Sequence, residues 1–248
     1  MSNQKTEKLG KILIPSITIA AIIAMFFIQP IPQDSAYHNF VDGRTILGIA
    51  NFWNVMSNLP FLLVGVMGLI QLQRLKTIAE MGVAYWLLFF GVALVAFGSG
   101  YYHLAPDNHT LVWDRLPMTI AFMSLFAIII AEFINIQKGR LLLFPLLIVG
   151  VLSVFYWQYT EANGAGDLRF YALVQFLPIV LIPIMLLLFP AKFSKVSGYW
   201  WLLLAYVIAK FLEYFDTQIF ALSANIISGH SIKHMAAAFG MYILLVSY

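Results

Sequence analysis

The chain has 248 residues and a net charge of +3; 62% of its residues are hydrophobic and only 10% are charged. A soluble domain usually carries about 25% charged residues, so this composition excludes a water-facing surface and indicates an integral membrane protein in a lipid bilayer. The basic residues are scattered, which excludes a nucleic-acid-binding face. The absence of cysteine excludes disulfides, zinc–thiolate sites and iron–sulfur clusters.

Eight apolar stretches approach the length of about 20 residues that a membrane-spanning helix needs. They lie at 11–29, 51–72, 82–103, 114–135, 141–158, 168–189, 197–220 and 230–247. The first stretch follows three lysines, as in a signal peptide, but it is longer than such a segment and no clean cleavage pattern follows it. We therefore predict an all-α integral membrane bundle of eight spans, forming a single transmembrane domain over residues 1–248.

The loops between eight spans alternate between the two sides of the membrane. One side collects Lys5, Lys8, Lys11, Arg74, Lys76, Lys138, Arg140, Lys192 and Lys195, and the other collects Arg44, Arg115, Arg169 and Lys233. Because loops rich in lysine and arginine stay in the cytoplasm, we predict that both termini are cytoplasmic. The histidines then lie on the outer side, and a bacterial inner membrane is the expected location.

Three histidines form a candidate metal site. His230 and His234 are four residues apart at the start of the last span, so they lie one turn apart on one helical face. His103 ends the third span at the same membrane depth, and three imidazoles leave a fourth zinc position open for water. The alternative interpretation is a pair of helix-end histidines that bind water or lipid headgroups. His109, in a polar turn, is a competing ligand.

Two polar residues accompany these histidines. Ser99 lies one turn before His103, and Asp114 opens the fourth span. Because an acidic residue in the first turn of a helix is favoured by the helix dipole, capping is one role for Asp114. The other is a chemical role, as a base or as a hydrogen-bond partner of a metal-binding histidine.

Further polar residues fall within other spans. Asn51 and Asn54 share a helical face, where they can join helices or support the site through hydrogen bonds. Lys210, Glu213 and Asp216 form a polar stripe in the seventh span. We interpret this stripe first as internal ion pairing and second as a path for a substrate or a proton.

The order and spacing of these residues resemble a known family. The CREST superfamily, which includes the alkaline ceramidases and the adiponectin-type progestin receptors, has a similar pattern: Ser99-x3-His103, then Asp114, then His230-x3-His234. The segment NFWNVMSNLPF, at 51–61, is similar to the start of the first core helix in the alkaline ceramidase branch. The resemblance covers residues 40–247 and implies a ceramidase-like core of seven helices, to which residues 1–30 add one N-terminal span.

The resemblance implies a zinc-dependent amidohydrolase that works inside the membrane. The implied metal ligands are His103, His230 and His234, and the implied catalytic residues are Ser99 and Asp114. The implied reaction cleaves the N-acyl amide bond of a ceramide-like lipid and releases a fatty acid and a sphingoid-type amine. The partners are then a membrane lipid substrate and the bilayer itself.

The resemblance also suggests calcium as a second bound metal. Eukaryotic alkaline ceramidases carry a calcium-binding acidic stretch before the first core helix, including a glutamate just before Phe-Trp-Asn. Here Asn51 stands at that place, and the main upstream acid is Asp42. Asp42, Asn51 and Asn54 are therefore expected either to support the metal ligands or to be the remnant of a calcium site, which leaves Ca²⁺ open.

Two other functions fit some of the same residues. A receptor-like lipid-binding protein would keep the zinc site for structural reasons, and it would not turn over an N-acyl lipid. A transporter would use Lys210, Glu213 and Asp216 along a polar path, and it would show flux in liposomes. The hydrolase is the leading interpretation, because Ser99 and Asp114 accompany the histidines.

Overall fold

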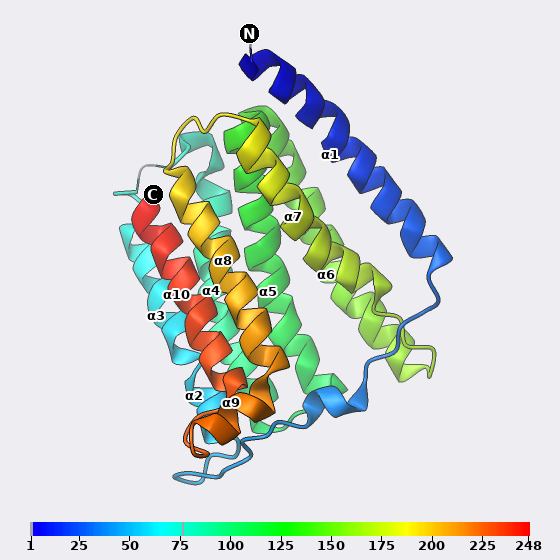
Figure 1. Ribbon diagram of the computed structural model, residues 1–248, viewed down its shortest axis with the longest axis vertical. Coiled ribbons are helices and arrows are strands. Elements are labelled where there is room, and N and C mark those ends of the chain that lie inside the picture. The colour runs from blue at the N-terminus through cyan, green and yellow to red at the C-terminus, as the bar shows by residue number, and fades with distance from the viewer. Residues whose placement is uncertain (1, 76) are drawn as a thin grey trace. The chain divides into compact units, whose positions relative to one another are not determined.

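The computed structural model describes residues 2–75 and 77–248, and this part of the chain is largely helical. The α-helices are α1 (Ser2–Phe27), α2 (Phe52–Met56), α3 (Leu59–Gln71), α4 (Gly82–Leu104), α5 (Asn108–Ile129), α6 (Ile136–Ala162), α7 (Arg169–Leu188), α8 (Val196–Tyr214), α9 (Asp216–Leu222) and α10 (Gly229–Ser247) (Figure 1). Shorter helical turns are η1 (Ser35–His38), η2 (Ala79–Met81) and the π-helical η3 (Ile130–Ile134). The described residues hold no β-strand, which confirms the all-α prediction.

Six helical segments of the described residues are long and apolar enough to cross a membrane. They are Gln4–Phe27, Phe52–Gln71, Ala79–Leu104, Asn108–Ile134, Ile136–Ala162 and Arg169–Leu188. These segments coincide with the first six predicted spans and make the chain a multi-pass membrane protein. The last two predicted spans fall on α8 to α10, which carry more polar side chains, and the helix breaks between Tyr214 and Asp216. The predicted count of eight spans is therefore not confirmed.

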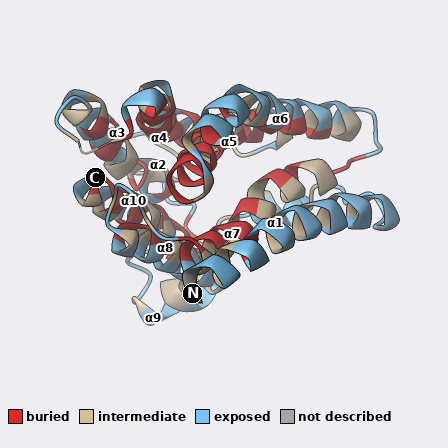
Figure 2. Cartoon of the chain, turned by 90° about the horizontal axis from the view of Figure 1, so that it is seen from above, coloured by how far each residue is buried: buried red, intermediate tan, exposed pale blue. Residues whose placement is uncertain are grey.

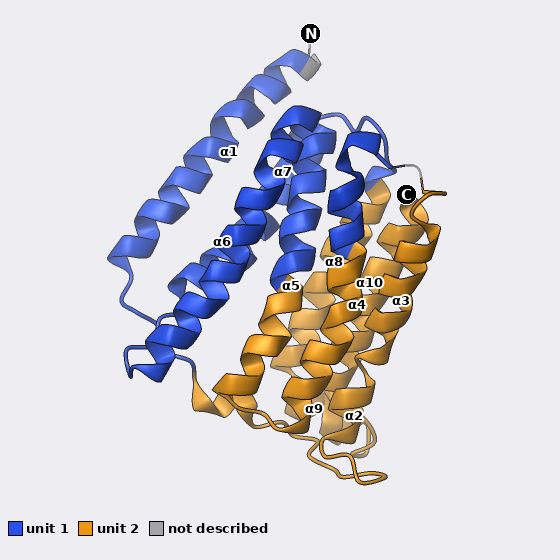
Figure 3. Ribbon diagram, turned by 180° about the vertical axis from the view of Figure 1, so that it is seen from behind, with its two compact units in different colours: residues 1–33, 76–88, 119–196 blue, residues 34–75, 89–118, 197–248 orange. Residues whose placement is uncertain are grey.

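The chain divides into two compact units, which Figure 3 distinguishes by colour. The first unit comprises residues 1–33, 76–88 and 119–196, and in it α7 packs against both α1 and α6. The side chains of α1 are mostly exposed (Figure 2), as expected for an apolar helix that faces lipid. The buried carboxylate of Glu132 accepts hydrogen bonds from the backbone and the hydroxyl of Ser194, which compensate for its burial.

The second unit comprises residues 34–75, 89–118 and 197–248, and it contains all of the candidate site. Within it α10 packs against α2, α3 and α9. A Cβ atom on Gly65 of α3 would lie only 2.4 Å from the backbone nitrogen of Ala93 in α4, so these two helices touch backbone to backbone. Such small-residue contacts are typical of helices packed in lipid. The organisation into one transmembrane domain, with residues 1–30 added to a core at 40–247, stays a prediction.

Candidate metal centre

The three predicted histidines come together in the second unit. His103 on α4 and His230 and His234 on α10 are all buried, and their ring nitrogens lie within 4.8 Å of one another. The Nε2 atoms of His103 and His230 are 3.4 Å apart. Two nitrogens that share a tetrahedral zinc ion at about 2.0–2.1 Å stand about 3.3–3.4 Å apart, so this pair is already spaced for a common metal ion.

The start of α10 determines where His230 and His234 lie. The hydroxyl of Ser228 caps the helix by accepting the backbone N–H of Ser231 at 3.1 Å. A Cβ atom on Gly229 would lie 2.2 Å from the carbonyl oxygen of Leu212, so only glycine allows this close approach to α8. The carboxylate of Asp216 then accepts the backbone N–H of His230 at 2.6 Å. The four-residue spacing therefore presents both rings on one helical face, as predicted.

Residues of the segment before α3 also contact the histidines. The side-chain amide of Asn51 donates to the carbonyl oxygen of His103 at 2.8 Å. Asn51 itself adopts a left-handed backbone conformation, with φ of 49°, at the N-cap of α2. The ring of Phe40 lies edge-on against His103 and His230, with ring centroids 4.7 and 4.5 Å apart. Phe40 was not predicted, because nothing in its local sequence connects it to the histidines.

The ring of His234 is oriented by Ser57, the residue that follows α2. The Ser57 hydroxyl is 2.8 Å from Nδ1 of His234 and 3.2 Å from the carbonyl oxygen of Asn54. A hydroxyl that donates its one hydrogen to the carbonyl must accept from the imidazole. Nδ1 then carries the proton, and Nε2 keeps the lone pair that a metal ion needs. Metal-binding histidines commonly have such a partner on the other ring nitrogen.

Ser99 and Asp114 also meet, where α4 crosses α5. The side chain of Ser99 faces the carboxylate of Asp114 and interacts with it. The adjacent Gly98 makes this crossing possible, because a Cβ atom there would lie 2.0 Å from the carbonyl oxygen of Trp113. Ser99 is buried and precedes His103 by one helical turn, so the predicted spacing brings the pair to the helix that carries the first histidine.

Other predicted residues have different positions. His109 lies exposed in the first turn of α5 and is not part of the histidine group, so it does not compete as a ligand. The predicted polar stripe separates into two contacts. Glu213 forms ion pairs with Lys210, at 2.6 Å, and with Lys233, whereas Asp216 turns to the backbone of His230. Ion pairing is therefore the role that the contacts of this stripe support.

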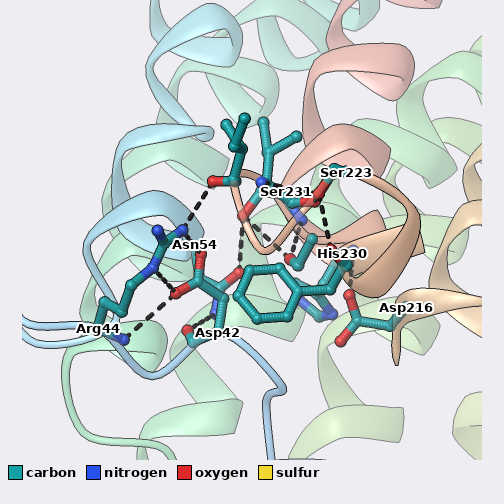
Figure 4. A network of polar contacts seen from close by, with 11 residues as sticks. Asp42, Arg44, Asn54, Asp216, Ser223, His230 and Ser231 are labelled. Atoms are coloured by element: carbon teal, nitrogen blue, oxygen red, sulfur yellow. Dashed lines mark hydrogen bonds and ion pairs between the residues drawn. The ribbon is translucent and has the colours of Figure 1, made fainter. Parts of the chain in front are cut away.

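Asp42 and Asn54 take part in a polar network beside the histidines (Figure 4). The side-chain amide of Asn54 donates to the carbonyl oxygen of Asp42 at 3.1 Å, and the hydroxyl of Ser231 donates to Oδ1 of Asn54 at 2.9 Å. The carboxylate of Asp42 is paired with Arg44. The sequence identifies Arg44 only as a loop residue, because the segment around it forms no helix or strand whose geometry would predict the pair.

The fold and the site together define a multi-pass helical membrane protein with a buried histidine triad that could hold a metal ion. The model of the Ceramidase family matches residues 44–248, and the chain belongs to this family. No curated protein matches the chain. Family membership confirms the resemblance found in the sequence, and it implies an amidohydrolase with a lipid substrate.

Proposed function

We propose that the protein is a zinc-dependent hydrolase that cleaves the N-acyl amide bond of a ceramide-like lipid within the membrane. The observation that carries the proposal is the convergence of the three buried histidines in a member of the Ceramidase family. The proximity of Ser99 and Asp114 on the adjoining helices supports a catalytic role over a purely structural one.

The donor set suits zinc. Three neutral nitrogen ligands leave one position of a tetrahedral ion open, as in catalytic rather than structural zinc sites. When bound, zinc supplies a water activated for attack near neutral pH and polarises the carbonyl of the substrate. The partners of the histidines favour this arrangement, because Ser57 leaves Nε2 of His234 available and Asp216 holds the start of α10.

In this proposal Asp114 transfers the proton, and Ser99 stabilises the negative charge that develops on the substrate. Asp114 accepts the proton of the attacking water and passes it to the nitrogen of the leaving amine. Ser99 donates a hydrogen bond, first to Asp114 and then to the negative charge that develops on the substrate oxygen. Such donors and bases typically contribute about 10²–10⁴-fold each to a hydrolytic rate.

The membrane environment determines how the substrate arrives. Because an N-acyl lipid resides in the bilayer, we expect it to enter laterally and to place its acyl chain among the apolar helices. We also propose that both termini are cytoplasmic and that the histidines face the outer side of a bacterial inner membrane. The cysteine-free chain allows a direct test. Asn163→Cys should react with an impermeant maleimide on intact cells, and Lys192→Cys should not.

The function is tested with purified protein and a fluorescent N-acyl sphingoid lipid. We expect about one zinc per chain by elemental analysis, turnover that a chelator abolishes, and recovery on adding zinc. His103→Ala should lose both metal and turnover, and the exposed His109→Ala should keep both. Turnover by metal-free His103→Ala would refute the zinc mechanism. Zinc binding without turnover of any N-acyl lipid would instead favour the receptor-like alternative.

A further inference from the structure

The segment between η1 and α2 carries a buried carboxylate that is neutralised from within the chain. The side chain of Asp42 is only 1% exposed. Nε of Arg44 donates to Oδ1 of Asp42 at 2.7 Å, and an Nη atom donates to Oδ2 at 2.6 Å (Figure 4). Both carboxylate oxygens are thus engaged by one guanidinium, in the two-pronged geometry that makes arginine–carboxylate pairs specific.

The same guanidinium also reaches the polypeptide around α9. An Nη atom of Arg44 donates to the carbonyl oxygen of Ile226 at 2.7 Å, and the guanidinium carbon lies 5.4 Å from the ring centroid of Phe220. Arg44 therefore connects the segment before α2 to α9 and to the loop that leads into α10. α9 carries Asp216, whose carboxylate accepts the backbone N–H of His230, and the loop leads directly into α10, which carries His230.

The segment held by Arg44 lies directly against the histidines. Phe40, two residues before Asp42, contacts the rings of His103 and His230. The carbonyl oxygen of Asp42 accepts a hydrogen bond from Asn54, which in turn accepts one from Ser231. Loss of the guanidinium would leave a buried charge without a partner and release this side of the site.

We propose that Arg44 is the internal cation of this segment: it neutralises the Asp42 carboxylate in place of a bound calcium ion and holds Phe40 over His103 and His230. Calcium takes six to eight oxygen ligands, usually with several carboxylates. Between residues 30 and 58 the chain offers two carboxylates: Asp34, which is exposed and accepts the backbone N–H of Ala36, and Asp42, whose oxygens are engaged by Arg44. The side-chain nitrogen of Asn51 donates to the carbonyl of His103, so Asn51 could add only one neutral oxygen, Oδ1. The residues present do not fit calcium.

The chain provides a matched control in its first unit. Arg169 pairs with Asp167, also two residues earlier, through Nε at 2.8 Å and an Nη atom at 2.7 Å. Arg169 also donates to the carbonyl oxygen of Ile28. The chemistry is the same in both pairs, but the Asp167–Arg169 pair lies in the unit without the histidines.

Calcium dependence is the first test. The thermal unfolding midpoint of the purified full chain is measured in millimolar CaCl₂ and in calcium-depleted buffer without chelator, with the same zinc content in both. Binding at about a hundredfold above Kd would raise the midpoint by several degrees, whereas we expect a difference below about one degree. A rise of several degrees with calcium would overturn the proposal.

The second test follows the backbone directly. Hydrogen exchange, read by mass spectrometry, should accelerate at least tenfold over residues 39–51 in Arg44→Ala, and it should be unchanged there in Arg169→Ala. Arg44→Lys keeps the charge but loses the fork, so it should show intermediate exchange even if Arg44→Ala fails to fold. Wild-type exchange over residues 39–51 in Arg44→Lys would contradict the positioning role. Neither test measures lipid turnover, so the results of both are independent of the proposed hydrolase function.

Discussion

The hydroxyl oxygen of Ser57 lies 2.8 Å from Nδ1 of His234, a residue 177 positions further along the chain. The contact fixes which ring nitrogen faces the other two histidines. Residues with this role support metal affinity because they hold both the tautomer and the orientation of the ring.

Ser57→Ala should therefore lower zinc affinity about 10–100-fold while the protein stays folded. The measurement is a competition titration against a chelator of known affinity, combined with thermal unfolding of the metal-free protein. Ser153→Ala is the matched control, since Ser153 is also buried but bonds to the carbonyl of Gly150 in its own helix. Equal affinities of the two variants would show that His234 does not depend on Ser57.

Asp216→Ala should destabilise the start of α10. The lost hydrogen bond to the backbone N–H of His230 is of the helix-capping kind, so the cost is about 0.5–2 kcal/mol. Asp216→Asn keeps an acceptor oxygen and should recover most of that stability, as measured by denaturant unfolding in detergent. A variant pair with the same unfolding free energy as wild type would mean that Ser228 alone caps the helix.

Gly98→Ala should separate α4 from α5 at the level of Ser99 and Asp114. The new methyl group would meet the carbonyl oxygen of Trp113 at 2.0 Å, and such overpacking costs about 1–3 kcal/mol. We expect lower stability and a fall in turnover that exceeds the loss of folded protein. Gly100→Ala is the control on the same helix, since its Cβ would find only Val55 at 3.9 Å. Similar turnover in the two variants would argue against a role for the crossing.

Asp167, in the loop between α6 and α7, should make the stability of the folded protein depend on pH. Hydrogen bonds from Arg169 lower the pKa of this carboxyl from 3.8 to about 2. Because the folded-state pKa is the lower one, its contribution to stability is fully present above about pH 4 and is lost as pH falls through about 2. Asp167→Asn should therefore be less stable than wild type near pH 6, with a difference that shrinks toward pH 2. A difference independent of pH would contradict this assignment.

Local sequence features were sufficient for part of the site. The four-residue spacing of His230 and His234 needs only a helix, and α10 supplies it. Ser99 and His103 follow the same rule on α4. The position of Asp114 beside Ser99 required the further assumption that α4 and α5 pack together near the loop that joins them. Gly98, which permits this contact, is recognised only from the structure.

The sequence predicted the first six spans better than the seventh. Six continuous apolar runs became helices long enough to cross a membrane. The seventh run contains a helix break near Phe215, within the stripe of Lys210, Glu213 and Asp216, and an average of hydropathy over the whole apolar run conceals it. The shift of Asp216 from the polar stripe to the start of α10 is a consequence of that break.

The sequence by itself determined the membrane class, the helical fold and which three histidines to consider as metal ligands. Lipid-facing helices need continuous apolar runs, and a shared helical face needs a spacing of three or four residues, so both are visible in the local sequence. Only the tertiary structure decided how those histidines are held. Ser57, Phe40 and Arg44 act across large separations in the chain, through hydrogen bonds and ring contacts that have no local period. It also decided that the Asp42 carboxylate is paired with a guanidinium, since that depends on where α9 and its loop pack.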